Sequence, residues 1–396
     1  MLGSRKVTTL GGDKFKDEYS LAFDGTDDYI ATTLNGNTFD GDFTISAWVK
    51  NESEDIYHSI FSHYQDSDNY MNFYIPKSSV TSANKIGFHG KVGGTNYYVT
   101  GTTQIFATND WVHVVFTQDD SSNAQFMYVN GVVDQDETRD FDMDMAGTTY
   151  IGKLSPSSSH IHQGNISEIA IYDTALSASQ VKTLYNGREP YNHKEGIASS
   201  NLKAWWRMGD GTLDKASLDR AGDDSGLICD EVNPTLGAEL VSNGDFDDET
   251  NWSDYQMEGD DTADLSTEQV LVGSNSLKID VSNAGEGTRL GGVATTTGKT
   301  YRISAWFYVT AGTAKINPGD DKWSPDGLEP KTNVTNEWQQ LVTYNTADTD
   351  EANAWIYFQA GSNSSVFYLD NVSVREVQGN PGIFLNSDTQ FTGDTP

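Results

Sequence analysis

Residues 164–187 change their period half-way, and this change constrains the fold more than any other feature of the sequence. Residues 166–173 alternate between two sides, which predicts a β-strand. Ser177 then stands where a helix N-cap belongs, Gln180 completes a capping box, and Gly187 predicts a left-handed stop. The sequence therefore predicts a strand followed directly by one short helix. The two sides of the strand would hold Ile166, Glu168, Ala170 and Tyr172 on one and Ser167, Ile169, Ile171 and Asp173 on the other.

Short alternating runs bounded by Gly, Asn or Asp lie before this stretch. With 37 Gly among 396 residues, and with many Thr, Val, Ile and Tyr between them, such runs favour an all-β sandwich over helices. Asn130 and Gly131 between two of the runs are a strong hairpin signal. A hydrophobic content of 36% over this length is enough for two domains with real cores. The runs of the first half are residues 19–30, 43–50, 111–120, 127–133 and 149–154.

The formal net charge of −33 argues against two classes of partner. So negative a surface repels phosphate backbones and anionic lipids, so we expect no nucleic acid and no membrane insertion. It offers carboxylates to hard cations such as Ca²⁺, although solubility alone explains most of the charge. Cys229 is the one cysteine, so no intrachain disulfide forms. No apolar segment follows the first residues, so we expect a protein made in a cytoplasm without a signal peptide.

The runs of the first half, closed by the strand and the helix, resemble the laminin-G-like jelly roll. That family belongs to the concanavalin-A-like lectin and glucanase group. The resemblance covers residues 19–187 and rests on the ordered series of runs. It implies an antiparallel sandwich that one short helix closes. Residues 1–18 are then expected to be an N-terminal arm.

The second half resembles another jelly roll. The phrases N-G-D-F from Asn243, G-S-N-S-L-K from Gly273 and Y-L-D-N-V from Tyr368 are similar to carbohydrate-binding modules of families four and nine. This resemblance implies a second antiparallel sandwich over residues 237–377. The predicted fold class is therefore all-β, with two tandem antiparallel jelly-roll β-sandwiches and a short helix closing the first.

Two segments lie outside the predicted sandwiches. Residues 188–236 have few strand signals and are predicted to be a connector. In it, Trp205 and Trp206 are interpreted as packing residues that join the two domains, and a ligand role is the alternative. Residues 378–396 hold Gly, Pro and polar residues and are predicted to be a C-terminal tail that forms an arm.

Catalysis is the activity that the glucanase relatives suggest. Retaining hydrolysis needs two carboxylates about 5–5.5 Å apart, which acids at alternate positions of one strand face would supply. Glu168 stands alone on its predicted strand, and the acids Asp142 and Asp144 lie in a loop-like context that favours solvent. We therefore expect no enzyme; a glycoside hydrolase with Glu168 as its acid is the alternative.

Calcium is the predicted cofactor. In carbohydrate-binding modules of this resemblance, a structural Ca²⁺ bridges the first strand to the last. The resemblance assigns its carboxylates to Asp247 and Asp370, with backbone oxygens near Asp245 and Ser274. The alternative is that Asp370 only caps a turn. A second candidate in the first sandwich, which turn formation would equally explain, is the acid group Asp24, Asp27 and Asp28.

Glycan binding would need exposed aromatic rings, because the C–H faces of sugars stack on them. Alternation over residues 301–309 and 353–361 predicts core residues on one parity, and leaves four rings on the other. They form a stacking platform if the two strands are neighbours; the alternative is that other parts of the chain cover them. Trp338 is expected in the core. The predicted platform is Trp306, Tyr308, Trp355 and Tyr357.

The tandem arrangement, the phrase W-W-R-M-G-D-G from Trp205 and the last predicted strand resemble structural proteins of marine tailed bacteriophages. The resemblance implies a non-enzymatic virion surface protein, as a head decoration or a fibre-like appendage. Its partners would be other virion proteins and host-surface glycans, and self-association stays open. The alternative is a secreted polysaccharide-binding protein, or a glycoside hydrolase, of a marine bacterium.

Overall fold

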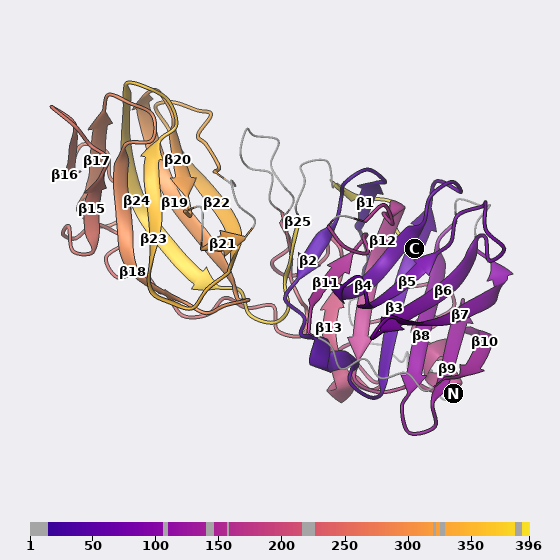
Figure 1. Ribbon diagram of the computed structural model, residues 1–396. Coiled ribbons are helices and arrows are strands. Elements are labelled where there is room, and N and C mark those ends of the chain that lie inside the picture. The colour runs from indigo at the N-terminus through magenta and orange to yellow at the C-terminus, as the bar shows by residue number, and fades with distance from the viewer. Residues whose placement is uncertain are drawn as a thin grey trace, which may run out of the picture.

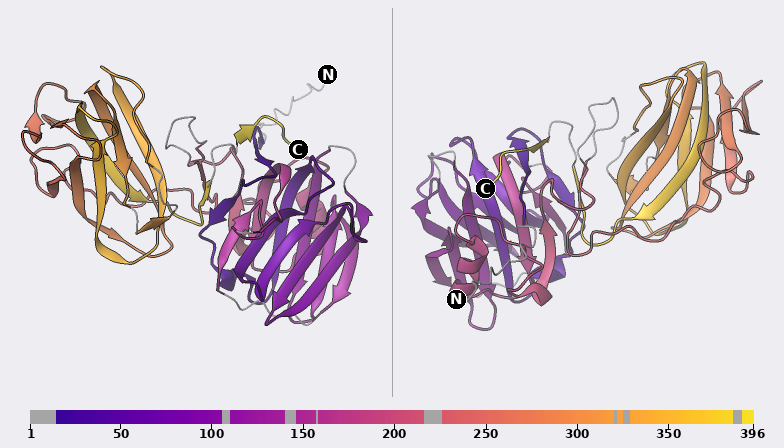
Figure 2. Two further views of the ribbon diagram at one scale, coloured as in Figure 1. Left: turned by 45° about the horizontal axis from the view of Figure 1, so that its top comes forward. Right: turned by 180° about the vertical axis from the view of Figure 1, so that it is seen from behind.

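The computed structural model describes residues 15–105, 110–139, 146–156, 158–215, 226–319, 322–324, 329–384 and 390–396. Two β-sandwiches form two separate lobes (Figure 1), and Figure 2 shows from two further sides that the connection between them is narrow. Wherever strands pair in the described part of the chain, they pair antiparallel, as the sequence predicts for tandem jelly rolls. No helix among the described residues is long and apolar enough to cross a membrane.

The first sandwich packs two large sheets against each other. In the order of pairing, one sheet holds β10 (Val132–Thr138), β9 (Ala124–Val129), β8 (Val112–Asp119), β3 (Phe43–Asn51), β12 (Gln163–Tyr172), β1 (Ser20–Asp24) and β26 (Gln390–Thr392), with β13 (Leu202–Trp206) also on β12. The other sheet holds β14 (Leu227–Ile228), β25 (Gly382–Phe384), β2 (Ile30–Thr32), β11 (Thr148–Ile151), β4 (His58–Asp66), β5 (Asn69–Ile75), β6 (Lys85–Val92) and β7 (Thr95–Gln104). A short 3₁₀ turn, η1 (Gly36–Phe39), follows β2.

Local signals at two turns of this sandwich are confirmed. Asn130 and Gly131 both have positive φ, 50° and 74°, as a tight hairpin between β9 and β10 requires. Helix α1 (Ala178–Tyr185) begins with the capping box of Ser177 and Gln180. It ends at two left-handed residues, Asn186 with a φ of 48° and the predicted Gly187 with a φ of 71°.

The predicted alternation of β12 breaks at Glu168. Glu168 has a φ of 51°, and the pairing of β12 with β3 shifts between Ser167 and Ala170, which is a β-bulge. The bulge moves Ile169 and Ile171 onto the same core as Ile166. The predicted grouping was wrong here because period-two counting cannot register one extra residue.

The connector is part of the first sandwich. Trp206 lies in the core between the two sheets, and its Nε1 donates to the carbonyl of Asn380 at 2.8 Å. Trp205 lies on the other side of β13 in the cluster that α1 covers, with Val181 and Leu184. The interpretation that the two tryptophans join the domains was wrong: β13 pairs with β12 and buries both rings within the first lobe. A second 3₁₀ turn, η2 (Ser199–Asn201), leads into β13.

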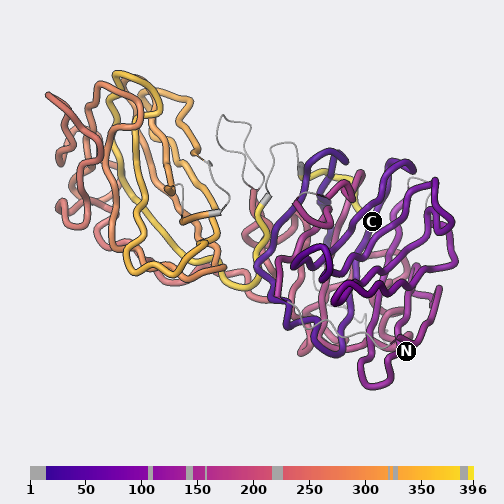
Figure 3. The backbone as a smooth tube through the Cα atoms, in the orientation of Figure 1, coloured from indigo at the N-terminus to yellow at the C-terminus, as the bar shows by residue number. Residues whose placement is uncertain are grey.

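The predicted C-terminal arm is also wrong for its described part. After the second sandwich the chain returns to the first, where β25 pairs with β2 and β14, and β26 pairs with β1. Figure 3 shows the yellow end of the chain on the indigo and magenta lobe. Asp394 accepts hydrogen bonds from Lys50 and Trp111. Both ends of a discontinuous domain are thereby held together. The first fourteen residues of the predicted N-terminal arm lie outside the described residues.

The second sandwich is continuous in sequence. Its smaller sheet holds, in pairing order, β15 (Trp252–Tyr255), β18 (Gly287–Thr295), β23 (Glu351–Ala360) and β20 (Ala314–Asn317). Its larger sheet holds β16 (Thr262–Ser266), β17 (Ser276–Val281), β24 (Ser365–Glu376), β19 (Thr300–Ala311), β22 (Trp338–Ala347) and β21 (Trp323–Ser324). The two sheets enclose one apolar core that includes Phe307, Phe358 and Phe367.

The two lobes meet at a small apolar cluster. Leu227 and Ile383 of the first lobe pack with Val342, Tyr344 and Val377 of the second. The residues of this cluster are buried, although they come from β14, β25, β22 and the end of β24. The lobes therefore share a narrow contact rather than a common core.

Candidate functional site

The predicted platform of four rings is not assembled. The parity is confirmed: Ile303 and Phe307 on β19, like Ile356 and Phe358 on β23, point into the core. However, β19 belongs to the six-stranded sheet and β23 to the four-stranded sheet. The rings on their outer faces therefore lie on opposite sides of the sandwich. The condition on which the four-ring platform depended, that the two strands are neighbours, is not met.

The four-stranded sheet carries one of the two aromatic groups. Trp355 is 40% exposed, and Tyr357, two residues along β23, lies on the same face. A third ring comes from β15, where Tyr255 lies 4.4 Å from Tyr357 between ring centroids. We call Tyr255, Trp355 and Tyr357 the aromatic face. Sequence reasoning missed Tyr255, although its parity was readable: Trp252, three residues earlier, packs inward on Phe358.

Arg289 holds the aromatic face together. It lies on β18, between Ser253 of β15 and Tyr357 of β23 in the strand register. Its guanidinium stacks over Trp355 at 4.2 Å from the ring centroid, and its Nε donates to the Ser253 hydroxyl at 3.1 Å. The contact fixes the orientation of the Trp355 ring before any ligand arrives.

Gly291 lets this ring lie close to the sheet. A Cβ at Gly291 would stand 2.6 Å from the Trp355 ring, so the ring could not keep this position beside a larger residue. The ring thus lies against the backbone of the neighbouring strand. Trp355 is therefore in contact with Gly291 and with the guanidinium of Arg289 over its ring.

A hollow of about 490 Å³ adjoins the aromatic face. Asn317 and Asn353 contribute amides, and Lys322 and Glu351 form an ion pair of 3.0 Å at its edge. This pair lowers the pKa of Glu351, chiefly through the hydrogen bond from Lys322. The amide of Asn317 is oriented by Gln359 and by the backbone N–H of Gly319. The hollow therefore combines flat rings with fixed hydrogen-bonding groups, which is the composition of a sugar-binding surface.

The opposite, six-stranded sheet carries the other aromatic group. Tyr308 lies beside Trp338 at 5.7 Å and beside Tyr368 at 6.2 Å, both edge to face. Trp306 lies on the same face of β19, two residues before Tyr308. Trp338 was expected in the core, but it is half-buried on the outer face, where its register places it opposite Tyr308.

The three predicted calcium residues do not come together. Asp370 is buried, and its Oδ2 accepts the backbone N–H groups of Leu271 and Val272 at 2.8 and 3.0 Å. Burial raises its pKa, and the nearby Asp245 adds to this. Asp247 is exposed, and the three acids do not form a group with mutually close ligand atoms. Asp370 thus caps a turn, which was the alternative to a role in calcium binding. Calcium stays a prediction, and of the three predicted residues only Asp245 and Asp370 lie near each other.

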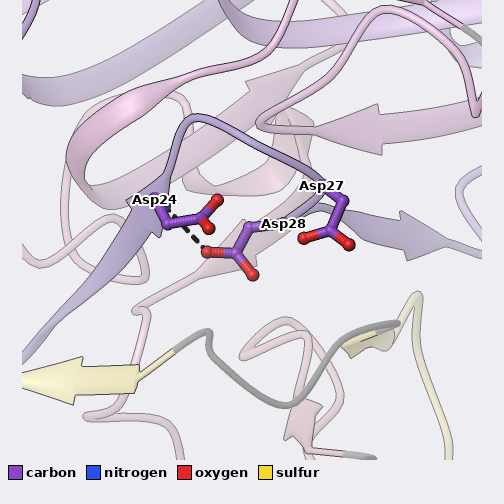
Figure 4. Close-up of side chains that lie close together, drawn as sticks. All are labelled: Asp24, Asp27 and Asp28. Carbon is purple, nitrogen blue, oxygen red and sulfur yellow. Dashed lines mark hydrogen bonds between the residues drawn. The ribbon is translucent and has the colours of Figure 1, made fainter.

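The acids of the first sandwich do form a compact group. Ligand atoms of Asp24, Asp27 and Asp28 lie within 4.8 Å of one another (Figure 4). Asp28, which is buried, accepts the backbone N–H of Asp24, and Asp24 in turn accepts that of Thr26. These bonds order the turn between β1 and β2, as turn formation predicts. Metal binding at this turn remains a prediction.

Glu168 is not placed for hydrolysis. It is fully buried, and its carboxylate accepts hydrogen bonds from Trp205 Nε1 at 2.5 Å and Arg207 Nε at 3.2 Å. As predicted, no second acid accompanies it on β12; a partner carboxyl comes instead from Asp17 of the N-terminal segment, which contacts the carboxyl of Glu168. The sequence distance of 151 residues hid this partner. Asp142 and Asp144 lie outside the described residues.

Comparisons with known families agree with this division of the chain. Residues 24–182 match the family described as the concanavalin A-like lectin/glucanases superfamily, and residues 238–365 match the family described as carbohydrate binding domain. The chain carries these two domains in tandem. The first is hereafter the lectin-like domain and the second the carbohydrate-binding domain. The aromatic face and its hollow belong to the second. No curated protein matches the chain.

Solved structures resemble the fold only distantly. A putative carbohydrate binding protein from Bacteroides ovatus is 20% identical with a TM-score of 0.41; the match covers 55% of this chain and 56% of that one. The SAP-like pentraxin from Limulus polyphemus is 18% identical over 43% of this chain and 82% of that one, with a TM-score of 0.35. The tailspike protein 4 domain of bacteriophage CBA120 is 21% identical over 35% and 21%, with a TM-score of 0.30. At these scores none of the three carries an argument about function.

Proposed function

We propose that this protein binds a glycan chain on the aromatic face of its carbohydrate-binding domain and does not cleave it. The observation that carries the proposal is the Trp355 ring, which is held in contact with Gly291 and Arg289 next to Tyr255 and Tyr357. A ring that is fixed before binding loses little conformational entropy when a sugar stacks on it. The amides of Asn317 and Asn353 line the same hollow and can exchange hydrogen bonds with the hydroxyl groups of a sugar.

The charge of the site favours a neutral glycan. Lys322 is neutralised by Glu351, and the guanidinium of Arg289 is occupied by the Trp355 ring and the Ser253 hydroxyl, so the site offers no pair of free cations that could clamp a sulfate or a carboxylate. The net charge of −33 adds long-range repulsion against acidic polysaccharides. We therefore expect binding to laminarin or xylan, and weaker binding to their sulfated derivatives.

Replacement of Trp355 tests this site. In affinity electrophoresis against neutral polysaccharides, Trp355→Ala should weaken retention at least about tenfold, which corresponds to losing about 1.4 kcal/mol of stacking. Trp306→Ala is the matched control, because it removes the same side chain from the opposite sheet. Equal retention by wild type and Trp355→Ala, or a larger loss in Trp306→Ala, would refute the site.

We expect binding without cleavage because Glu168, the candidate catalytic acid of the hydrolase alternative, is buried. Glu168 lies beneath Trp205 and Arg207 with no part of its side chain exposed. Incubation with laminarin or agar should release no reducing sugar. Turnover that disappears in Glu168→Gln would establish the hydrolase alternative.

We place this binding on a virion surface, where the protein would contact other virion proteins and present the site to host-surface glycans. The support is the resemblance of the tandem arrangement to structural proteins of tailed bacteriophages. A secreted polysaccharide-binding protein is equally consistent with the aromatic face. Capsid or portal genes next to this one, or its peptides in purified particles, would support the virion; a polysaccharide-utilisation locus would support the alternative.

A further inference from the structure

The segment of residues 15–19 lies across the edge of the lectin-like domain and is tied at both ends. At one end Phe15 packs on Trp205 at 5.8 Å between ring centroids, and the guanidinium of Arg207 stacks on Phe15 at 4.4 Å. Arg207 also donates to the carbonyl of Lys16. At the other end Asp210 accepts the backbone N–H groups of Glu18 and Tyr19, each at 2.8 Å.

Between these two ends, Asp17 of the segment lies next to the buried Glu168. Asp17 Oδ1 lies 3.5 Å from the hydroxyl of Ser167, and its carboxyl contacts that of Glu168. Both oxygens of Glu168 already accept bonds, from Trp205 and Arg207. Asp17 Oδ2 is buried and has no donor among the described residues. Two ionised carboxylates cannot hydrogen-bond each other, so this contact needs a proton on one of them.

The charges around the pair make ionisation of both acids unfavourable. Among the residues that the structure describes, the cation in contact with the pair is Arg207, and Asp210 adds a third carboxylate on the segment's other side. His193, behind Trp205, stays neutral because burial lowers its pKa to about 3. The hollow beside the segment is lined by Lys16, Glu18 and Glu189, which face solvent. One positive charge thus faces three acids, an arrangement in which two carboxyls share a proton.

We propose that residues 15–19 form a strap, held on the lectin-like domain by a proton shared between Asp17 and Glu168 and released when that proton is lost. Glu168 belongs to the bulge of β12, where its φ of 51° turns the carboxyl toward the strap instead of toward the core. Release uncovers the edge formed by Trp205 and Arg207. The strap is a device of this domain and does not depend on glycan binding.

The direction of the pH dependence follows from burial. Burial and mutual repulsion raise the pKa of Asp17 to about 9, and burial raises the pKa of Glu168 to about 7. Because both values lie above those of the unfolded chain, the contact is fully formed at acidic pH and is lost as pH rises through about 7 to 9. Each pH unit in that window weakens docking by at most about tenfold per proton.

Tryptic cleavage after Lys16 measures the strap in the full chain. Cleavage is quantified by mass spectrometry at pH 6.5 and 9.5, each relative to a free peptide of residues 12–22. We expect strong protection at pH 6.5 and at least about tenfold less at pH 9.5, with the near-ultraviolet circular dichroism unchanged. Protection that is equal at both values, or that falls only with global unfolding, would overturn the proposal.

The variant Asp17→Asn tests whether the shared proton causes the pH dependence. Asparagine keeps the shape and can donate its amide to Glu168 at any pH, so this variant should stay protected at pH 9.5 against a peptide with the same substitution. Glu18→Gln, which neutralises the exposed neighbour, should behave as wild type. Loss of protection in Asp17→Asn at pH 6.5, persistence of its pH dependence, or loss of pH dependence in Glu18→Gln would each overturn the shared proton.

Discussion

The two sandwiches close in different ways. The carbohydrate-binding domain is one continuous piece, from β15 to β24, and its core is complete without the rest of the chain. The lectin-like domain is assembled from two stretches of the chain, since β13 and β14 lie before the second domain and β25 and β26 lie after it. The second domain is thus inserted into the first. When strands far apart in the sequence complete a sheet, the contacts between them cannot be predicted from local sequence patterns.

Buried charge follows the same division. Loops without regular pairing leave N–H groups that need acceptors, and the connector meets this need with buried acids. Asp214 accepts the N–H groups of Gly209, Gly211 and Cys229. In the carbohydrate-binding domain the buried acids Asp370 and Glu286 fill a comparable role for one loop each. Among the described residues of the lectin-like domain, three buried acids accept backbone N–H groups in this way: Asp28, Asp230 and Glu231.

The largest expected difference between the domains is the response to Trp206→Ala. This ring lies in the core of the lectin-like domain, so its loss should cost about 3–5 kcal/mol there. Calorimetry of the full chain should show the first domain melting earlier and the second unchanged. As a control, Trp338→Ala should affect only the second transition, and less, because that ring is half-buried. A parallel shift of both transitions would mean that the domains unfold as one unit.

Truncation after Val377 should come next in size. It removes β25, β26 and the bonds of Asp394 to Lys50 and Trp111, and we expect a loss of about 2–4 kcal/mol. Although the deletion starts at the end of the second domain, the calorimetric loss should fall on the first. A loss confined to the carbohydrate-binding domain would contradict the insertion.

A smaller effect is expected from Asp230→Asn. Its two oxygens accept the N–H groups of Trp205, Val232 and Asn380. In the asparagine variant, the side-chain NH₂ group would replace one of these oxygens and would face a backbone N–H, which it cannot accept. Chemical denaturation should show a loss of about 1–3 kcal/mol from the lectin-like domain. Asp254→Asn, an exposed change on β15, should stay within about 0.5 kcal/mol of wild type. A similar loss in the free energy of unfolding for both variants would contradict the claim that the buried acids of the connector stabilise the lectin-like domain.

Chelation should have the smallest effect. Since Asp370 already holds its loop through backbone N–H groups, EDTA should lower the second transition by about 2 °C or less. A larger drop that Ca²⁺ reverses and Asp370→Asn abolishes would establish calcium at Asp245 and Asp370.

Part of the candidate site could be predicted from the sequence: which rings point outward, but not which sheet carries them. Alternation along β19 and β23 correctly separated core residues from outward rings, and it would have found Tyr255 by the parity of Trp252. It could not find which sheet each strand joins. Arg289 and Gly291, which hold the Trp355 ring, were likewise out of reach, because a cation over a ring is a cross-strand contact without a sequence period.

The sequence by itself determined the local structure of this protein: tight turns such as Asn130-Gly131, the capped helix after β12, and the inward parity of most strands. These depend on neighbours within a few residues, so short-range sterics and hydrogen bonds decide them. Only the tertiary structure decided that the tail returns to the first domain, that Asp17 meets Glu168, and that the aromatic rings divide between two sheets. Such contacts join residues far apart along the chain, and the burial of one shared core selects them.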